Sequence, residues 1–224
     1  MPSTLAQFRT RISQALLDTS NVSFAIAAID EALQTALDDY SQAAPFSNEA
    51  LLTLPGAGRT IALDSITGLL AVTQIWWPYD SLKDDDVNDA ANLVDGFVLR
   101  FDDARPAVQL KIRSGSGAPV LNDEIYVWYT KPHTIQNLAS SAITTVVATH
   151  ETGLVTGASG YAALARAIDI TETYNQRRAQ AEIESWGLRQ LATFRAWLAI
   201  VHTAAPVGRT KVFGTGWQLD KWDK

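Results

Sequence analysis

The stretch VSFAIAAIDEALQTALDDYSQAAPFSNEALLTLPGAGRTIAL, residues 22–63, decides the fold because the spacing of its apolar residues changes midway. Before Pro45 they recur every three or four positions, as in a helix with one buried face. These residues are Val22, Ile26, Ile29, Leu33, Ala36 and Tyr40. Pro45 disfavours helix at the residue before it. From residue 50 the period is two, across 52–54 and again across 61–63, with a Pro-Gly turn between them. The stretch therefore predicts a helix followed by strands.

A shorter helix is predicted upstream of this stretch. Thr4 and Gln7 match a capping box, in which the Thr side chain covers a free helix amide and the Gln reaches back. Apolar residues follow at helical spacing: Leu5, Phe8, Ile12 and Leu16. A polar break comes at 18–21, and we expect Asn21 to cap the next helix. Two helices joined by a short link indicate an antiparallel hairpin.

Downstream of the stretch, further segments have strand character. The alternation of apolar and polar residues over 108–113 is typical of a strand with one buried face. Similar segments lie at 69–77, 97–101 and 125–129. Short strands with Gly- and Pro-containing turns predict a small antiparallel sandwich or barrel. Residues 80–95, DSLKDDDVNDAANLVD, are predicted to form a long acidic loop within it.

The helical period returns after Pro132. An Ala-rich helix is predicted over 152–173 and a longer one over 174–203. The longer helix has an apolar stripe of Ile183, Trp186, Leu191, Phe194, Leu198 and Val201. The layout is therefore two helices, a β segment, two helices and a tail.

This layout predicts an α+β fold. We expect residues 1–48 and 132–205 to form a helical bundle in which the first and last helices pack together. Residues 49–131 would form an inserted β domain, a small antiparallel sandwich or barrel. Residues 206–224 would form an extended C-terminal arm.

The composition excludes several classes of protein. Hydrophobic residues make up 47% and charged residues 19%, which is globular composition. No apolar run approaches the roughly 18–20 residues that cross a bilayer, and residues 1–11 lack the apolar core of a signal peptide. The absence of cysteine excludes disulfides and thiolate sites. A net charge of −6 disfavours nucleic-acid binding as the main role. We expect a soluble cytoplasmic protein.

One motif imitates a cofactor site. Residues 155–161, Val-Thr-Gly-Ala-Ser-Gly-Tyr, with Ala163 match the opening of a short-chain dehydrogenase fingerprint. In that fingerprint the glycines follow a strand and cradle a pyrophosphate. Here no apolar strand precedes the motif, and too little chain follows it for the rest of such a fold. A helix whose small residues permit close packing explains the motif better.

Other candidate groups fit structural or solvated roles better than chemical ones. Asp84, Asp86, Asn88 and Asp95 imitate a calcium loop, but Asp89 stands where the turn glycine is required. None of the remaining candidates has the spacing of a catalytic site: Arg59, His133, His150, His202, Asp38–Asp39 and Asp102–Asp103. We therefore expect no catalytic residue, no metal site and no cofactor, and a protein that is not an enzyme.

The tryptophans indicate binding surfaces. Trp76 and Trp77 are adjacent on a predicted strand, so one side chain enters the core and the other must be covered by something else. Trp217 and Trp222 lie in a tail too short to form a core of its own. Such an aromatic, lysine-containing tail either docks on another protein or folds onto its own domain.

Four segments together resemble the head–tail connector (adaptor) proteins of tailed bacteriophages. They are Leu37-Asp38-Asp39-Tyr40-Ser41, Trp77-Pro78-Tyr79, the stretch from His133-Thr134-Ile135 to Thr144-Thr145, and residues 157–167. The resemblance covers residues 1–200 as a pattern and leaves the tail unmatched. It implies a structural virion protein that forms a ring, usually twelve-fold, below the portal, and through which DNA passes.

The implied partners are further copies of the chain, the portal protein and the downstream neck and tail proteins. DNA would pass without specific binding, and no membrane is involved. The implied location is the head–tail interface of the virion, and the host cytoplasm during assembly. Connectors commonly reach the portal with a C-terminal arm. By this resemblance we expect a partner-binding surface on Lys211, Phe213, Trp217, Leu219 and Trp222.

Two alternatives remain open at the level of the sequence. One is another neck, tail-completion or baseplate subunit. The other is a carbohydrate- or surface-binding module, for which Trp76, Trp77, Trp128 or Trp217 would be the stacking platforms.

Overall fold

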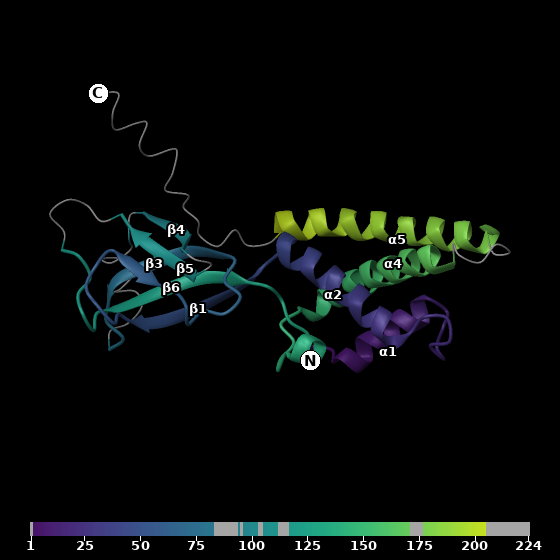
Figure 1. Cartoon of the computed structure of the whole chain (residues 1–224), viewed down its shortest axis with the longest axis horizontal. Helices are drawn as coiled ribbons and strands as arrows, with labels where there is room; N and C mark the ends of the chain where they lie inside the picture. The colour runs from purple at the N-terminus through teal and green to yellow at the C-terminus, as the bar shows by residue number, and fades with distance from the viewer. Residues whose placement is uncertain are drawn as a thin grey trace, which may run out of the picture. The chain divides into compact units, whose positions relative to one another are not determined.

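The computed structural model describes residues 2–82, 94, 96–102, 105–111, 117–170 and 177–204. Over these residues the chain is of mixed α/β class, with four α-helices and two small antiparallel sheets and without a closed barrel (Figure 1). It divides into two compact units. Residues 1–46 with 132–205 make a helical unit, and residues 47–131 fall in a sheet unit.

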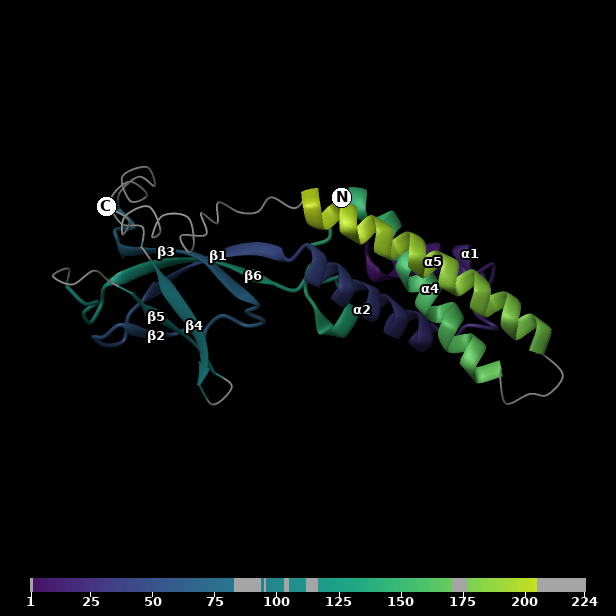
Figure 2. The same cartoon turned by 90° about the horizontal axis from the view of Figure 1, so that it is seen from above.

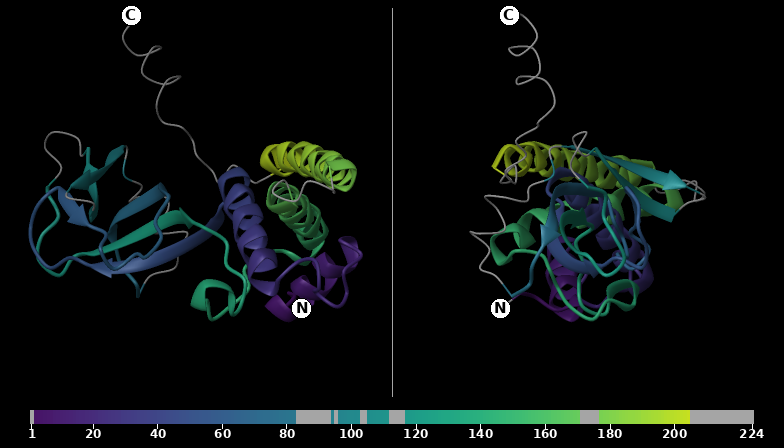
Figure 3. Two further views of the ribbon diagram at one scale, coloured as in Figure 1. Left: turned by 45° about the vertical axis from the view of Figure 1, so that its right-hand side comes forward. Right: turned by 90° about the vertical axis from the view of Figure 1, so that its left-hand side faces the viewer.

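The helical unit is organised around one central helix. Its helices are α1 (Leu5–Ala15), α2 (Ile26–Ala43), α4 (Glu151–Ile170) and α5 (Arg177–Ala204), with short 3-10 turns at Leu138–Ser140 and Ala148–His150. Helix α4 lies between α1 and α5 and also packs on α2 (Figure 3). The expectation that the first and last helices pack together is wrong, because each of them packs mainly on α4.

The predicted start of α1 is confirmed. Thr4 is the N-cap, its backbone N–H donates to Gln7 Oε1 at 2.8 Å, and the Gln7 N–H reaches back to Thr4 Oγ1. The predicted apolar face is also confirmed, since Leu5, Phe8 and Ile12 are buried in the core of the unit. A capping box could be predicted because it depends only on residues close in sequence.

The predicted start of the second helix is wrong. Asn21 is not the cap, because α2 begins five residues later, at Ile26. The side chain of Asp18 instead accepts the N–H groups of residues 22–24 and holds the chain in a loop. Val22, the first member of the predicted stripe, is therefore 84% exposed, whereas Ile29 and Leu33 are fully buried.

The sheet unit has two three-stranded sheets (Figure 2). One has the order β1-β6-β3, with β1 (Phe46–Thr53), β6 (Glu124–Lys131) and β3 (Ala71–Tyr79). The other has the order β2-β5-β4, with β2 (Thr60–Ala62), β5 (Arg105–Leu110) and β4 (Phe97–Asp102). A single apolar core draws on both sheets, including Ile75, Val127 and Val108.

Several predicted features lie outside the described residues. They are the arm, 206–224, with its five expected partner-binding residues, the imitation calcium loop Asp84, Asp86, Asn88 and Asp95, and Asp103. The prediction for each of these features stays a prediction.

Candidate functional site

The cofactor-like motif lies inside helix α4. Residues 155–161 are helical throughout, and the segment 132–150 before α4 contains 3-10 turns and no strand. The small residues face α5 instead. A Cβ placed on Gly153 would lie 2.6 Å from the ring of Trp197, one on Gly157 2.8 Å from Phe194, and one on Gly160 2.9 Å from Leu191. Because such approaches are closer than van der Waals contact, only glycine lets these two helices lie together as they do in Figures 1 and 2. We call this contact the glycine seam.

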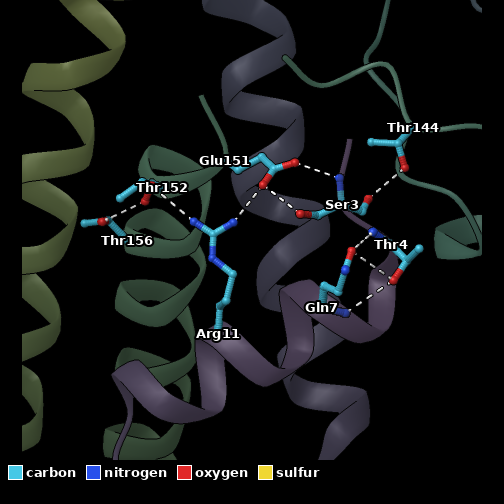
Figure 4. A network of polar contacts seen from close by, with 8 residues as sticks. All are labelled: Ser3, Thr4, Gln7, Arg11, Thr144, Glu151, Thr152 and Thr156. Carbon is cyan, nitrogen blue, oxygen red and sulfur yellow. Dashed lines mark hydrogen bonds and ion pairs between the residues drawn. The ribbon is translucent and has the colours of Figure 1, made fainter. Parts of the chain in front are cut away.

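A buried carboxylate ties the start of the chain to α4. Glu151, in the first turn of α4, accepts the backbone N–H and the hydroxyl of Ser3, both at 2.7 Å, and an Arg11 N–H at 2.8 Å (Figure 4). Arg11 also donates to Thr152 Oγ1. Burial raises the pKa of the Glu151 carboxyl, but its hydrogen bonds to Ser3 and Arg11 outweigh burial and leave the pKa lowered. The network holds α1 against α4.

Two histidines that are far apart in sequence meet around Tyr40. The Tyr40 hydroxyl lies 2.7 Å from His150 Nδ1, and its ring centroid is 4.6 Å from that of His133 and 5.7 Å from that of Trp197. Burial raises the pKa of Tyr40 to about 12 and lowers that of His133. The His133 ring contacts the carbonyl of Ala44 at 2.9 Å and the hydroxyl of Thr145 at 3.1 Å. These contacts join α2 to the segment before α4, which is a structural role.

The remaining chemical candidates are dispersed. His202 Nδ1 is 2.9 Å from the carbonyl of Ala43, and the hydroxyl of Tyr161 donates to Asp39. Arg59 lies in the turn after β1, where its carbonyl accepts the N–H of Leu110. Among the described residues no group of three or more acids and histidines could hold a metal ion.

The helical unit carries an apolar groove, which we call the helical groove. Its volume is about 740 Å³, within the range of sites that hold small ligands or side chains. It lies between the loop after α1, the C-terminal half of α4 and the N-terminal half of α5. Its lining is Ala15, Leu16, Leu17, Ser23, Phe24, Ala163, Arg166, Glu182, Ile183 and Trp186. Ile183 and Trp186, which belong to the apolar stripe of the predicted helix 174–203, line the groove and remain partly exposed.

The loop that forms one wall of this groove has a left-handed residue and is crossed by side-chain hydrogen bonds. Leu17 has φ of +55°, a left-handed conformation that costs a leucine roughly 1–2 kcal/mol, and its side chain is 92% exposed. The Asp18 carboxylate accepts three backbone N–H groups across the loop, at 2.8 to 3.1 Å. Burial raises the pKa of the Asp18 carboxyl and these three hydrogen bonds lower it, with a net lowering. The Leu17 N–H donates to the Gln14 carbonyl and the Asp18 N–H to the Ser13 carbonyl, so Leu17 occupies the left-handed position of the motif that ends α1, which is a structural role.

The sheet unit carries a cluster of aromatic rings on the side away from its core. Because Ile125, Val127 and Tyr129 point into the core, the intervening Tyr126 and Trp128 point away from it. They contact Trp76, whose ring centroid is 4.1 Å from that of Trp128, and Tyr79, 4.8 Å from Tyr126. We call Trp76, Tyr79, Tyr126 and Trp128 the aromatic face.

The prediction that Trp76 and Trp77 point to opposite sides of the sheet is confirmed. Trp77 packs against the core, and its Nε1 donates to Asp123 at 3.1 Å. Trp76 lies in the aromatic face, where it is only 7% exposed. Its Nε1 is buried without a hydrogen-bond acceptor in the described part of the chain. A buried N–H without an acceptor is unfavourable, which makes this atom the least satisfied polar group of the face.

No protein-family model matches this chain, and no curated protein matches its sequence significantly. No helix within the described ranges combines the length and the apolarity needed to cross a bilayer.

Proposed function

We propose that this protein is a structural subunit of a phage neck, a head–tail connector that assembles into a ring between portal and tail. The observation that carries the proposal is the apolar surface left outside the two cores, in the helical groove and on the aromatic face. Surfaces of this kind, edged by polar residues, are typical of proteins that are covered by a partner. The resemblance of the four sequence segments to connectors supplies the class of assembly.

In this proposal the four helices act as a bundle and the two sheets as a sandwich inserted into it. The insertion is favoured by the order of the elements, since the six strands of the described residues lie between α2 and α4. Ring subunits associate head to tail, so each needs two different surfaces that complement one another. The net charge of −6 suits a ring through which DNA slides, because like charges disfavour binding.

The C-terminal arm is the proposed contact with the portal, through Lys211, Phe213, Trp217, Leu219 and Trp222. Other copies of the chain and the downstream neck or tail proteins are the remaining proposed partners, and the virion neck is the proposed location. The same surfaces would serve a tail-completion or baseplate subunit, which the portal experiment below separates from a connector.

A carbohydrate- or surface-binding module is the second candidate, and the aromatic face favours it. Tyr126 and Trp128 remain partly exposed and could stack on a sugar ring. Trp77 is less suited as a platform, because it packs on the core and is bonded to Asp123. Binding of the isolated monomer to a glycan array, lost in Trp128→Ala, would favour this candidate.

The decisive experiment mixes the purified chain with the portal protein of the phage genome that encodes it. We expect rings on the portal in negative-stain images and a matching mass by mass photometry. Deletion of 208–224 should leave the circular dichroism spectrum unchanged and abolish the association. As the matched control, replacing 208–224 by a Gly/Ser segment of equal length should also abolish it. A full-length chain that stays apart from the portal, or a truncated chain that still binds, would contradict the proposal.

A further inference from the structure

We propose that the outer edge of β1 pairs, antiparallel, with β1 of a second copy of this chain. The sheet β1-β6-β3 then continues across a two-fold axis into the same sheet of the other copy. Main-chain hydrogen bonds join the copies, as when a strand is added to a sheet edge. This inference goes beyond the proposed function, since it concerns two free copies in solution, and its symmetry differs from that of the head-to-tail contacts of a ring.

One edge of β1 is left without a strand. β1 is the last strand of its sheet, and no strand of the described residues pairs with its other side (Figure 1). Directly after β1, the N–H of Leu54 donates to the Asp123 carbonyl at 2.9 Å, and the Leu54 carbonyl accepts the N–H of Asn122 at 3.0 Å. Because main-chain groups alternate between the two edges of a strand, those of residues 47, 49, 51 and 53 turn outward. Such a row of groups is a template for a further strand.

β1 also lacks the irregularities that protect other edges of the two sheets. It has eight residues in regular alternation, and it contains no proline and no basic residue. β2, at the edge of the other sheet, has only three residues. β3 breaks its register with β6 twice and contains Pro78, and its Ile75 carbonyl accepts the N–H of Val94. Short, irregular or proline-containing edges resist pairing, whereas β1 is long and regular.

The edge of β4 does not match that of β1. The Lys111 N–H donates to the Gly96 carbonyl, so Gly96 turns its main-chain groups toward the β5 side, and Phe97 and Leu99 turn theirs outward. Phe97 and Leu99 also pack on the core, whereas the outward-turned residues of β1 are exposed. An antiparallel pair of β1 with β4 would therefore oppose solvent-facing to core-facing residues, because opposite residues share a face of the sheet.

The edge of β1 does match that of a second β1. In each copy the outward-turned residues 47, 49, 51 and 53 are exposed, while Ala50 and Leu52 pack on the core. Opposite residues of the antiparallel pair are then both solvent-facing or both core-facing. The cores of the two copies therefore lie on the same side of the continued sheet, which favours a second copy as the strand that β1 binds.

Charge selects the register of the two strands. Centred on Glu49, the pair would oppose two carboxylates, and centred on Ala50 it would oppose Glu49 to Leu51. Centred on Leu51, Glu49 faces Thr53 of the second copy, whose hydroxyl can donate to the carboxylate. The two Glu49 residues are then about 13 Å apart along the strands, beyond the Debye length of about 8 Å at physiological ionic strength. This register also covers Leu51, which is 42% exposed in the single chain.

Cysteine cross-linking in the full-length chain tests the pairing and its register, because the sequence contains no cysteine. In the proposed pair the two Leu51 Cα atoms lie about 5.5 Å apart, within the span of a disulfide. The matched control is Ser47→Cys, on the same face and the same edge, where the two Cα atoms lie about 26 Å apart. We expect the intermolecular disulfide to form at least about ten-fold faster in Leu51→Cys than in Ser47→Cys. Equal rates would overturn the proposal.

Analytical ultracentrifugation of the full-length chain measures the association without a cross-link. We expect the mass to rise with concentration from 24.4 kDa toward twice that value. Glu49→Pro removes an outward N–H and is tolerated on an edge strand, so it should stay monomeric with an unchanged circular dichroism spectrum. Ser47→Pro is the matched control and should still associate, because residue 47 falls opposite Pro55, beyond the paired strands.

If Glu49→Pro unfolds, Leu51→Lys takes its place and should also stay monomeric, since it opposes two like charges. A natural chain that remains monomeric as the concentration rises, or association as strong in the folded variant as in the natural chain, would overturn the proposal. No portal is present, so the outcome of the portal experiment leaves this result unaffected.

Discussion

The two units place aromatic side chains in different ways. In the glycine seam each large α5 side chain meets a glycine of α4, so Phe194 and Trp197 fill space left for them by the backbone. In the aromatic face the rings meet mainly one another, and the N–H of Trp76 lacks an acceptor in the described residues. The first arrangement completes a core, and the second leaves a cluster whose buried indole N–H has no acceptor in the part of the chain that the structure describes.

This contrast separates structural from functional aromatic residues. An aromatic residue has a structural role where the residue opposite leaves space that its ring fills, as Gly157 does for Phe194. It is a candidate for binding where a buried polar group lacks a partner among the described residues, as for the N–H of Trp76. If the contrast is correct, substitutions in the glycine seam should affect folding strongly, and those in the aromatic face should affect folding weakly.

The largest effect is expected for Phe194→Ala. The ring is fully buried and stacks on Trp197, so its removal should cost about 3–5 kcal/mol of unfolding free energy, as for other large core truncations. Urea denaturation followed by circular dichroism measures it. Trp128→Ala is the matched change in the aromatic face and should cost less. A larger loss of unfolding free energy in Trp128→Ala than in Phe194→Ala would contradict the distinction between the glycine seam and the aromatic face.

The second-largest loss of stability is expected on removal of the buried carboxylate of Glu151. In Glu151→Ala the N–H and hydroxyl of Ser3 and the guanidinium of Arg11 lose their acceptor, which should cost about 1.5–3 kcal/mol. Its folded-state pKa is lowered, so its contribution is fully present above the unfolded value of about 4.3 and is lost as the pH falls further. The variant should therefore lose less stability than the natural protein between pH 5 and 3. Glu31→Ala, an exposed change on α2, is the control and should behave like the natural protein.

A smaller loss is expected for Gly157→Ala. The added methyl would meet the Phe194 ring at 2.8 Å, and overpacking costs about 1–3 kcal/mol, of which the better helix propensity of alanine returns up to about 1. Gly56→Ala, where nothing lies within 4 Å, should change stability little. Equal melting temperatures for the two variants would show that α4 and α5 can separate without loss.

The glycine seam shows what could be predicted from the sequence. Near both ends of the chain, apolar residues recur every three or four positions, and this spacing predicted the helices. In the middle of the chain they recur at every second position, which predicted the strands. Both patterns could be used because they depend on local backbone geometry. The small residues of 155–161 were correctly assigned to close packing, since no strand precedes them. Trp197, the partner of Gly153, was missed because it falls outside the simple apolar stripe of its helix.

The parts that sequence reasoning missed depend on contacts distant in the chain or on special backbone conformations. The start of α2 was misplaced because Asp18 binds three amides of the following loop, which competes with direct helix entry at Asn21. The meeting of His133 and His150 at Tyr40 depends on α2 and α4 packing together. The helical groove is formed by residues from three segments that are far apart in the sequence, so its position could not be predicted from any one of them. Trp186 gave the nearest indication, because it lies on the apolar stripe of its helix but does not belong to the helical core.

His133 gives a pH-dependent test of the helical unit. Burial lowers its folded-state pKa below the unfolded value of about 6.5, so the unfolded state binds the proton more readily. Stability should therefore fall as the pH drops below about 6.5, on the order of 1 kcal/mol or less at pH 5.5. Urea midpoints at pH 7.5 and 5.5 measure this loss. In His133→Gln the loss should shrink, and an unchanged loss would assign it to other groups.

The smallest effect is expected for Trp76→Phe, and the adjacent Trp77→Phe is its matched control. Both changes replace an indole by a phenyl ring, but Trp77→Phe also removes a hydrogen bond to Asp123, worth about 1 kcal/mol, whereas Trp76→Phe removes a buried N–H that has no acceptor among the described residues. The unfolding free energy should therefore change by less than about 1 kcal/mol in Trp76→Phe and by more in Trp77→Phe. If Trp76→Phe costs as much as its neighbour, the indole N–H is satisfied in the free protein. The aromatic face would then be completed like the glycine seam, and the distinction between the two regions would fail at its clearest point.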